Sequence, residues 1–241
     1  MSLTKVIHLS DLHIGAGDLA GVATHLVDKI IAEHDPEQHA VALTGDLVDE
    51  PTKANFKRAA ALLARLDGYR VMCVPGNHDV LPMRGVDLGL IGKGDYALWR
   101  RYISKGAYPQ RWPLGGGWTA LGIDTNEGSS TDATPDLARG EVGAAQLLRL
   151  TFELSRHNPV IVLGHHRLWW RDAAHLLKDA DELHSILDPR CALYLCGHQH
   201  EHHDIKRGGV RYIAAPSSTK SRRFQVIDLD DLEAAPVWCA L

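Results

Sequence analysis

Asp46 and Asp49 are two acidic residues only three positions apart, directly after an apolar run at residues 39–43 that predicts a buried strand. Gly45 lets the chain turn before Asp46, and the carboxyl end of a strand in an α/β sheet faces the crevice where ligands bind. Two carboxylates this close repel each other unless a positive group lies beside them. We therefore hypothesise that a metal ion lies there and that other parts of the chain supply further ligands.

Five predicted strands end in residues of the types that bind metal ions. The clusters are Asp11 and His13, Asp46 and Asp49, Asn77 and His78, His165 and His166, and His198 and His200. Because each cluster lies at the end of a strand, the side chains are expected to converge on one rim of a sheet. Carboxylate, amide and imidazole ligands together suit Mn, Fe or Zn. They are too many for one ion, and Asp46 is the best candidate for a carboxylate that bridges two.

The composition favours a single globular domain that spans residues 1–241. The hydrophobic content of 45% is ample for one core, and the net charge of -4 disfavours extended nucleic-acid binding. The four cysteines form no CxxC pair, which predicts buried thiols in a reducing compartment. Without an apolar run long enough to span a bilayer, we expect a cytoplasmic protein with no membrane partner. The sequence leaves open whether it forms a homodimer.

Apolar runs and amphipathic stripes alternate along the chain, which predicts an α/β fold. The expected strands cover residues 5–10, 39–43, 69–74, 118–123, 160–163, 192–195, 209–214, 224–229 and 236–240. The expected helices cover 18–34, 51–68, 95–103, a part of 137–157, and 172–187. Residues 80–94 and 124–139 are expected to be long loops of unassigned role. The strands carry the clusters, and the helices cover the sheets.

The five clusters and their glycines resemble the signature blocks of one enzyme family. The blocks are Asp11-x-His13, Gly45-Asp46-x-x-Asp49, Gly76-Asn77-His78-Asp79, Gly164-His165-His166 and Gly197-His198-x-His200. In this order they resemble the calcineurin-like metallophosphoesterases, and the likeness runs from residue 5 to about residue 219. The resemblance implies a four-layer α/β/β/α sandwich of two mixed sheets, with a dimetal site at the carboxyl ends of the strands.

The resemblance also implies a role for each residue of the blocks. The first metal ion would be held by Asp11, His13, Asp46 and His200, and the second by Asp46, Asn77, His165 and His198. His78 resembles the catalytic histidine of the family, and Asp49 the carboxylate that orients it. The assignments of His165 and His166 remain interchangeable at this point.

The implied reaction is the hydrolysis of a phosphodiester by in-line attack of a metal-bridging hydroxide. Ser10-Asp11-Leu12-His13 and Ala215-Pro216-Ser217-Ser218-Thr219 are similar to class III cyclic-nucleotide phosphodiesterases. These residues favour a small phosphorylated, nucleotide-like substrate. The candidate substrate-binding residues are His166, Arg167, Trp169 and Trp170. The tryptophans would either stack on a base or pack under the loop, and the arginine would either grip a phosphate or face water.

Other functions remain as alternatives. A phosphomonoesterase, a pyrophosphatase or a nuclease could use the same blocks, although a nuclease needs a basic groove beside the metal ions. A different class is a non-catalytic metal-binding interaction module that keeps the fold. Metal content and activity with added Mn would separate this module from an enzyme.

Overall fold

The structure is a computed structural model that describes residues 3–80, 96–128, 139–169, 175–188 and 190–241. The strands within these segments are β1 (Lys5–Leu9), β2 (His39–Thr44), β3 (Arg70–Val74), β4 (Gln110–Gly115), β5 (Trp118–Gly122), β6 (Val160–Leu163), β7 (Leu193–Cys196), β8 (His203–Arg207), β9 (Val210–Ala214), β10 (Arg223–Asp228) and β11 (Val237–Ala240). The helices are α1 (Leu19–Glu33), α2 (Lys53–Ala64), α3 (Asn77–Val80), α4 (Ala97–Tyr102), α5 (Ala144–Leu154), α6 (Ala180–Leu187) and α7 (Ser218–Ser221).

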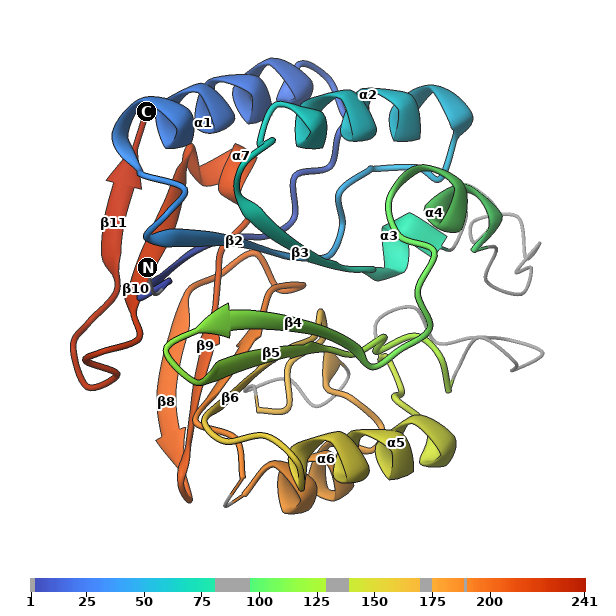
Figure 1. The fold of residues 1–241 in the computed structure, drawn as a ribbon. Helices are drawn as coiled ribbons and strands as arrows, with labels where there is room; N and C mark the ends of the chain where they lie inside the picture. The colour runs from blue at the N-terminus through green and yellow to red at the C-terminus, as the bar shows by residue number, and fades with distance from the viewer. Residues whose placement is uncertain (1–2, 81–95, 129–138, 170–174, 189) are drawn as a thin grey trace.

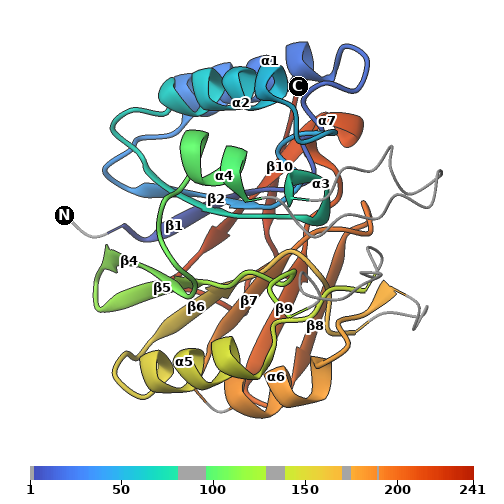
Figure 2. The ribbon, with the colours of Figure 1, turned by 90° about the vertical axis from the view of Figure 1, so that its right-hand side faces the viewer.

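The described strands form two mixed sheets. Their orders are β11-β10-β1-β2-β3 and β4-β5-β6-β7-β9-β8. The pairs β1–β2, β2–β3, β5–β6, β6–β7 and β7–β9 are parallel, whereas β1–β10, β10–β11, β4–β5 and β8–β9 are antiparallel. The sheets lie face to face, with α1 and α2 over the outer face of the first and α5 and α6 over the second (Figures 1 and 2). This arrangement confirms the predicted α/β/β/α sandwich.

The core has three layers because successive side chains of a strand point to opposite faces of its sheet. In β1, Val6 packs between the two sheets, whereas Ile7 and Leu9 pack under the helices that cover the first sheet. In β6, Val162 packs under α5 and α6, and Ile161 packs between the sheets. Strands buried on both faces need continuous apolar runs, which are the runs that predicted them.

Two edge strands were missed by the sequence prediction because they lack such runs. β8 has the sequence His-Asp-Ile-Lys-Arg, and all five of its residues are half-buried or exposed. β4 is exposed at alternate positions and includes Pro113, a residue tolerated mainly in edge strands. The short helices α3 and α7 were also missed, and α6 begins at Ala180 rather than at residue 172. Residues 81–95 and 129–138, which make up most of the two predicted long loops, lie outside the described segments.

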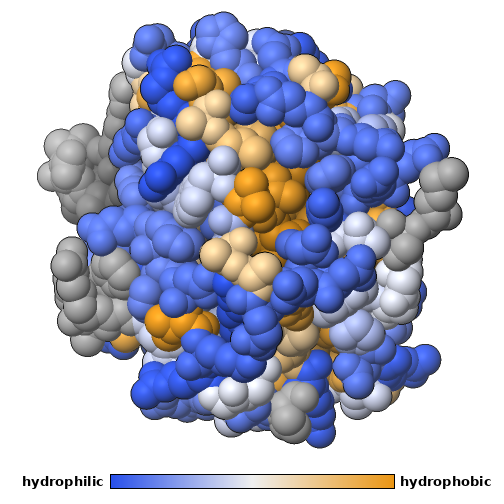
Figure 3. All heavy atoms as spheres, turned by 90° about the vertical axis from the view of Figure 1, so that its left-hand side faces the viewer, coloured by the Kyte–Doolittle hydropathy of each residue, from blue (hydrophilic) through white to orange (hydrophobic). Residues whose placement is uncertain are grey.

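The surface is mostly hydrophilic. Figure 3 shows the side that carries β8 and β11, where apolar atoms gather near the middle and hydrophilic residues surround them. Among the described helices, none combines the length and hydropathy that crossing a membrane requires. The cysteines are free thiols in described segments, and Cys73, Cys191 and Cys196 are buried, as predicted.

Candidate metal centre

The loops that follow β1, β2, β6 and β7 are held together by backbone hydrogen bonds. Asp11 N donates to the Gly45 carbonyl over 3.0 Å, and Gly197 N donates to the His165 carbonyl over 3.0 Å. The first bond joins two loops of the first sheet, and the second joins two loops of the second sheet. A further bond connects the sheets, because His198 N donates to Asp11 Oδ2 over 3.1 Å. The predicted clusters therefore do meet at one place.

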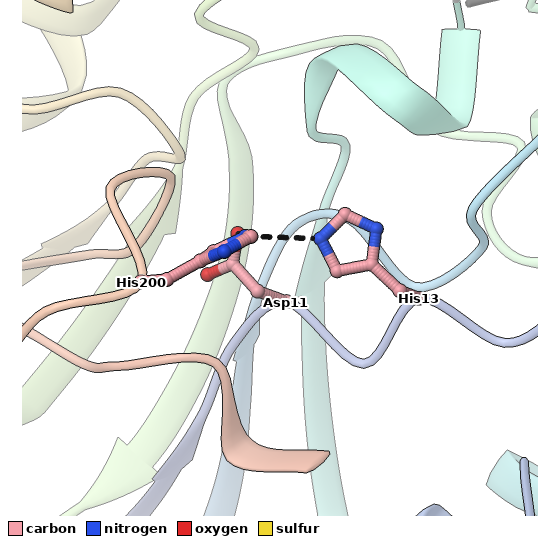
Figure 4. Close-up of side chains that lie close together, drawn as sticks. All are labelled: Asp11, His13 and His200. Atoms are coloured by element: carbon pink, nitrogen blue, oxygen red, sulfur yellow. Dashed lines mark hydrogen bonds and ion pairs between the residues drawn. The ribbon is translucent and has the colours of Figure 1, made fainter. Parts of the chain in front are cut away.

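Asp11, His13 and His200 form one group of facing donor atoms (Figure 4). The Nε2 atoms of His13 and His200 lie 3.0 Å apart, and His200 Nε2 lies 3.3 Å from Asp11 Oδ1. Asp11 and His13 are almost fully buried, whereas His200 is partly exposed. Two imidazole nitrogens and a carboxylate oxygen this close match the ligand set that Zn, Fe or Mn accepts.

Asp11, Asp46 and His165 form a second group. His165 Nε2 lies 3.4 Å from Asp46 Oδ2, 3.1 Å from Asn77 Oδ1 and 3.3 Å from His198 Nδ1. The other ring nitrogen, Nδ1, donates to the Thr44 carbonyl over 2.7 Å, because a carbonyl can only accept. This bond leaves the lone pair of Nε2 available for a metal ion and fixes the orientation of the ring.

Asp46 connects the two groups through one oxygen atom. Its Oδ2 lies 3.8 Å from His13 Nε2 and 3.4 Å from His165 Nε2. Its other oxygen, Oδ1, accepts a hydrogen bond from His78 N over 3.0 Å, which fixes the carboxylate plane. A carboxylate between two donor groups is in the place that a bridging ligand requires.

Backbone strain is concentrated at these residues. Of the six non-glycine residues with positive φ in the described segments, five are predicted ligands: Asp11, His13, Asp46, His198 and His200. The left-handed region costs a residue with a Cβ atom on the order of 1 kcal/mol, and such strain persists only where the surroundings enforce it. The loops therefore keep a strained backbone conformation that directs these side chains towards the metal centre.

Two glycines allow the second loop to approach the third. Gly45 has φ +93, and a Cβ atom there would lie 2.5 Å from His165 Nδ1. A Cβ atom at Gly76 would collide with Asp46 Oδ1. Both positions therefore require glycine, because the ligand side chains occupy the space that a larger residue would fill.

The electrostatics favour a cation in this place. Asp11 and Asp46 are 0% and 2% exposed, so they are two carboxylates deprived of solvent. Burial alone would raise the pKa of Asp46, but neighbouring histidines, His165 foremost, hold it well below its usual value. Burial would likewise lower the pKa of His165, yet Asp46 raises it to about 9. A metal ion at His165 Nε2 would take the place of the proton that this pairing holds.

His78 lies beside the two groups, but its partner differs from the predicted one. His78 Nδ1 donates to the backbone carbonyl of Asp49 over 2.8 Å, not to the carboxylate. The Asp49 carboxylate instead lies 3.3 Å from His13 Nδ1. The prediction that the carboxylate orients His78 is therefore corrected: the carbonyl does so, and the carboxylate is placed to orient His13. The difference arises because the carbonyl of Asp49, and not its carboxylate, faces His78 Nδ1.

The structure contradicts substrate contact for His166 and Arg167. His166 is fully buried, and its Nδ1 lies 2.7 Å from Thr125 Oγ1. Arg167 is 1% exposed, and its guanidinium donates to the carbonyls of Gly197 and Glu201. These hydrogen bonds stabilise the loop that carries His198 and His200. His165, not His166, faces the donor groups.

Trp169 packs where a substrate cannot reach both faces of its ring. It contacts the core under the second sheet, its ring lies edge-on to His184 at 5.1 Å, and the Arg207 guanidinium covers it at 4.0 Å. The alternative that it packs under the loop is the one the structure supports. Trp170 lies outside the described residues.

Ser217, Ser218 and Thr219 hold the loop of Asp11 rather than a ligand. Each is 1% exposed. Ser217 Oγ donates to the Asp11 carbonyl over 2.7 Å, Thr219 Oγ1 donates to the Leu12 carbonyl over 3.1 Å, and Ser218 bonds the backbone of Ser10. The nucleotide-like substrate was inferred partly from these residues, and that support is withdrawn because they are buried.

Two further residues of the site were missed from the sequence. Asp79 is fully buried and accepts from Gly76 N and Val48 N over 2.9 and 3.0 Å, so it fastens two ligand loops together. Lys220 Nζ lies 3.2 Å from His200 Nδ1. Asp79 is part of the block Gly76-Asn77-His78-Asp79, but the resemblance assigned it no role, and no pattern separated Lys220 from ordinary surface charges.

Comparisons with known proteins agree with this geometry. A family model described as calcineurin-like phosphoesterase matches residues 4–202. The chain belongs to this family. It is a metal-dependent phosphoesterase, and the family together with the clusters of metal-binding residue types implies two metal ions. The chain is 28% identical over 230 residues to the 3',5'-cyclic adenosine monophosphate phosphodiesterase CpdA of Escherichia coli K12, which covers 89% of this chain and 76% of that protein.

Other matches place this phosphoesterase among proteins of the same fold. It is 26% identical over 222 residues to a probable cyclic nucleotide phosphodiesterase of Vesicomyosocius okutanii, covering 89% of this chain and 86% of that one. The structure is similar to a dimetal phosphatase from Danio rerio, with a TM-score of 0.69, 13% identity, and 95% and 93% of the two chains covered. It is also similar to GAP50, the anchor in the inner membrane complex of Plasmodium, with a TM-score of 0.65, 13% identity, and 95% and 82% covered. The structural likenesses show the fold alone.

Proposed function

We propose that this phosphoesterase hydrolyses phosphodiester bonds of cyclic nucleotides or related small nucleotides with two bound ions of Mn, Fe or Zn. The observation that carries the proposal is Asp46 Oδ2, which lies within 4 Å of a nitrogen from each donor group. The diester preference is supported by the relatives described as cyclic-nucleotide phosphodiesterases. In this assignment Asp11, His13, Asp46 and His200 hold one ion, and Asp46, Asn77, His165 and His198 hold the other.

Two such ions lower the pKa of water and neutralise the phosphoryl oxygens during in-line displacement. The chain supplies the rest of the chemistry. His78 Nδ1 donates to the Asp49 carbonyl, so Nε2 is the nitrogen left to face the substrate. Burial alone would lower the pKa of His78, but the nearby Asp46 and Asp49 raise it, which favours the protonated ring. A protonated His78 can donate to a phosphoryl oxygen or give its proton to the leaving alkoxide.

Lys220 provides a cation at the edge of the site. Its side chain is exposed at the end that reaches His200, so it can attract an anionic substrate without the cost of burying a charge. This placement favours a small phosphorylated substrate. We assign Lys220 the role of attracting the phosphate group and His78 the catalytic role.

An activity panel with metal-reconstituted enzyme tests the proposal. The substrates are 3',5'-cyclic AMP, bis(p-nitrophenyl) phosphate, p-nitrophenyl phosphate and pyrophosphate, each with Mn, Fe or Zn. We expect turnover of the two diesters to exceed that of the monoester and of pyrophosphate. A monoester rate well above both diester rates would reject the diester assignment and favour a phosphomonoesterase.

The interaction-module alternative is disfavoured because both donor groups are present, with Asp11, His13, Asp46 and His165 buried and His200 partly exposed. We further propose that residues 1–241 form one domain, because β10 and β11 complete the sheet that β1 begins. A cytoplasmic location and a homodimer remain hypotheses that fractionation and light scattering would test.

A further inference from the structure

A pocket of about 770 Å³ is lined by residues of α4, of the segment before β4 and of α5. Figures 1 and 2 show where these helices and β4 lie. The pocket is lined by Tyr96, Ala97, Trp99, Arg100, Lys105, Gly106, Ala107, Tyr108, Asp124, Glu127 and Arg149. No predicted metal ligand is among these described residues. The volume falls in the range of about 300–1,000 Å³ that small-molecule sites occupy.

The segment from Asp124 to Glu127 separates this pocket from the metal centre. Asp124 and Glu127 line the pocket. The two residues between them face the other way: Thr125 Oγ1 lies 2.7 Å from His166 Nδ1, and Asn126 Nδ2 donates to the Pro75 carbonyl over 3.4 Å. The pocket is therefore a second potential ligand site, and residues 124–127 separate it from the metal centre.

The mouth of the pocket carries positive charge that its own residues leave unbalanced. Arg149 pairs with Glu127 at 2.7 Å. Arg100 and Lys105, in contrast, have no carboxylate partner within the described segments. Asp124 is 2% exposed, and burial raises its pKa to about 6, so at pH 7 it is still mostly ionised and offsets part of that charge. Three cations and two carboxylates line the pocket, and this excess of positive charge at a concave site in a protein of net charge -4 favours an anionic ligand.

Three aromatic residues, Tyr96, Trp99 and Tyr108, are among the other residues that line the pocket. Trp99 Nε1 donates to the Tyr108 hydroxyl over 3.1 Å, which fixes both rings in the wall. The Arg100 guanidinium lies 5.4 Å from the centre of the Tyr96 ring. Aromatic rings beside cations suit a ligand that has both a planar ring and a phosphate. A phosphate ion alone would leave most of the volume empty.

We propose that this pocket binds a mononucleotide at a second site, with Arg100 and Lys105 at the phosphate and Tyr96 beside the base. The proposal goes beyond the hydrolytic function, because neither the metal ligands nor His78 takes part. A nucleotide bound in this pocket acts as an effector and is not hydrolysed.

Calorimetric titration of AMP into the metal-loaded enzyme tests the second site, with orthovanadate present at saturation to occupy the metal centre. We expect about one equivalent of AMP to bind, and to bind more tightly than adenosine or inorganic phosphate. The double variant Arg100→Glu with Lys105→Glu should weaken AMP binding by about 10- to 100-fold, because two charged hydrogen-bond donors are lost. Arg100→Gln with Lys105→Gln should weaken it in the same direction without adding negative charge.

Arg101→Glu is the matched control. It makes the same charge change on the same helix, but Arg101 lies over the Tyr102 ring and does not line the pocket. AMP should bind to this variant as it does to the unmodified enzyme. Absence of AMP binding when vanadate is present would overturn the proposal, as would unchanged binding in both double variants. Phosphate that binds as tightly as AMP would overturn the nucleotide assignment, because the aromatic wall would then contribute nothing.

Discussion

Replacing Ser217 by alanine separates a residue that positions the metal site from one that contacts the substrate. Its hydroxyl donates to the Asp11 carbonyl over 2.7 Å and accepts from Lys220 N over 3.3 Å, as the N-cap of α7. The side chain is 1% exposed, so no water replaces it in Ser217→Ala. The change therefore removes one buried hydrogen bond to a ligand loop and one helix cap.

Both losses have known magnitudes. A buried neutral hydrogen bond contributes about 1 kcal/mol, and an N-cap serine contributes about 1 kcal/mol more. We expect the free energy of unfolding to fall by about 2 kcal/mol in Ser217→Ala. Asp11 has φ 54, so its backbone stays in place only while its partners hold it. Affinity for the first metal ion should therefore drop by about tenfold, which is typical when a partner of a ligand is removed.

The assays are urea unfolding of the metal-free protein, metal titration, and diester kinetics at saturating metal. KM should stay unchanged once metal is saturating, because Ser217 does not reach the substrate. Ser185→Ala is the control: this exposed serine bonds only the Glu182 carbonyl of its own helix, and it should change stability by less than about 0.5 kcal/mol. A raised KM with unchanged stability and metal affinity in Ser217→Ala would refute this reasoning and restore the substrate-binding hypothesis.

Three further predictions follow from the same contacts. Asp46→Ala should lose most of its bound metal, measured by elemental analysis, because one oxygen lies between both donor groups; retention of two equivalents would contradict the bridging role. His78→Ala should keep its metal and lose about 10²- to 10⁴-fold in turnover number, the usual contribution of a general acid, and a full rate would exclude that role. Burial lowers the pKa of His8 from 6.5 to about 3, so the unfolded chain binds more protons than the folded one between these values. The free energy of unfolding should therefore decrease as pH falls from 6.5 towards 3, by up to about 1.4 kcal/mol per pH unit. Urea titrations of His8→Gln should show a smaller dependence of this free energy on pH. The same pH dependence in the variant and the unmodified protein would contradict the prediction.

Local sequence patterns were sufficient for much of the fold and for the candidate donor set. The strands with continuous apolar runs, such as β2 and β7, were predicted because strands buried on both faces need such runs. β4 and β8 were not predicted, since an edge strand needs no apolar run and its pairing partner is not local. The donor residues could be named because they occur at strand ends, where the chemistry of each side chain and its neighbouring glycine can be seen directly in the sequence.

The amino-acid sequence specifies which residue types reach the carboxyl ends of the strands and in what order. Which atoms face each other depends on the three-dimensional arrangement of the loops. His165 rather than His166 turns to Asp46, the Asp49 carboxylate turns to His13, and Ser217 holds Asp11 although the two lie far apart in the chain. The physical reason is that side-chain direction in these loops is set by left-handed backbone conformations and by distant hydrogen-bond partners. Neither leaves a periodic pattern in the sequence.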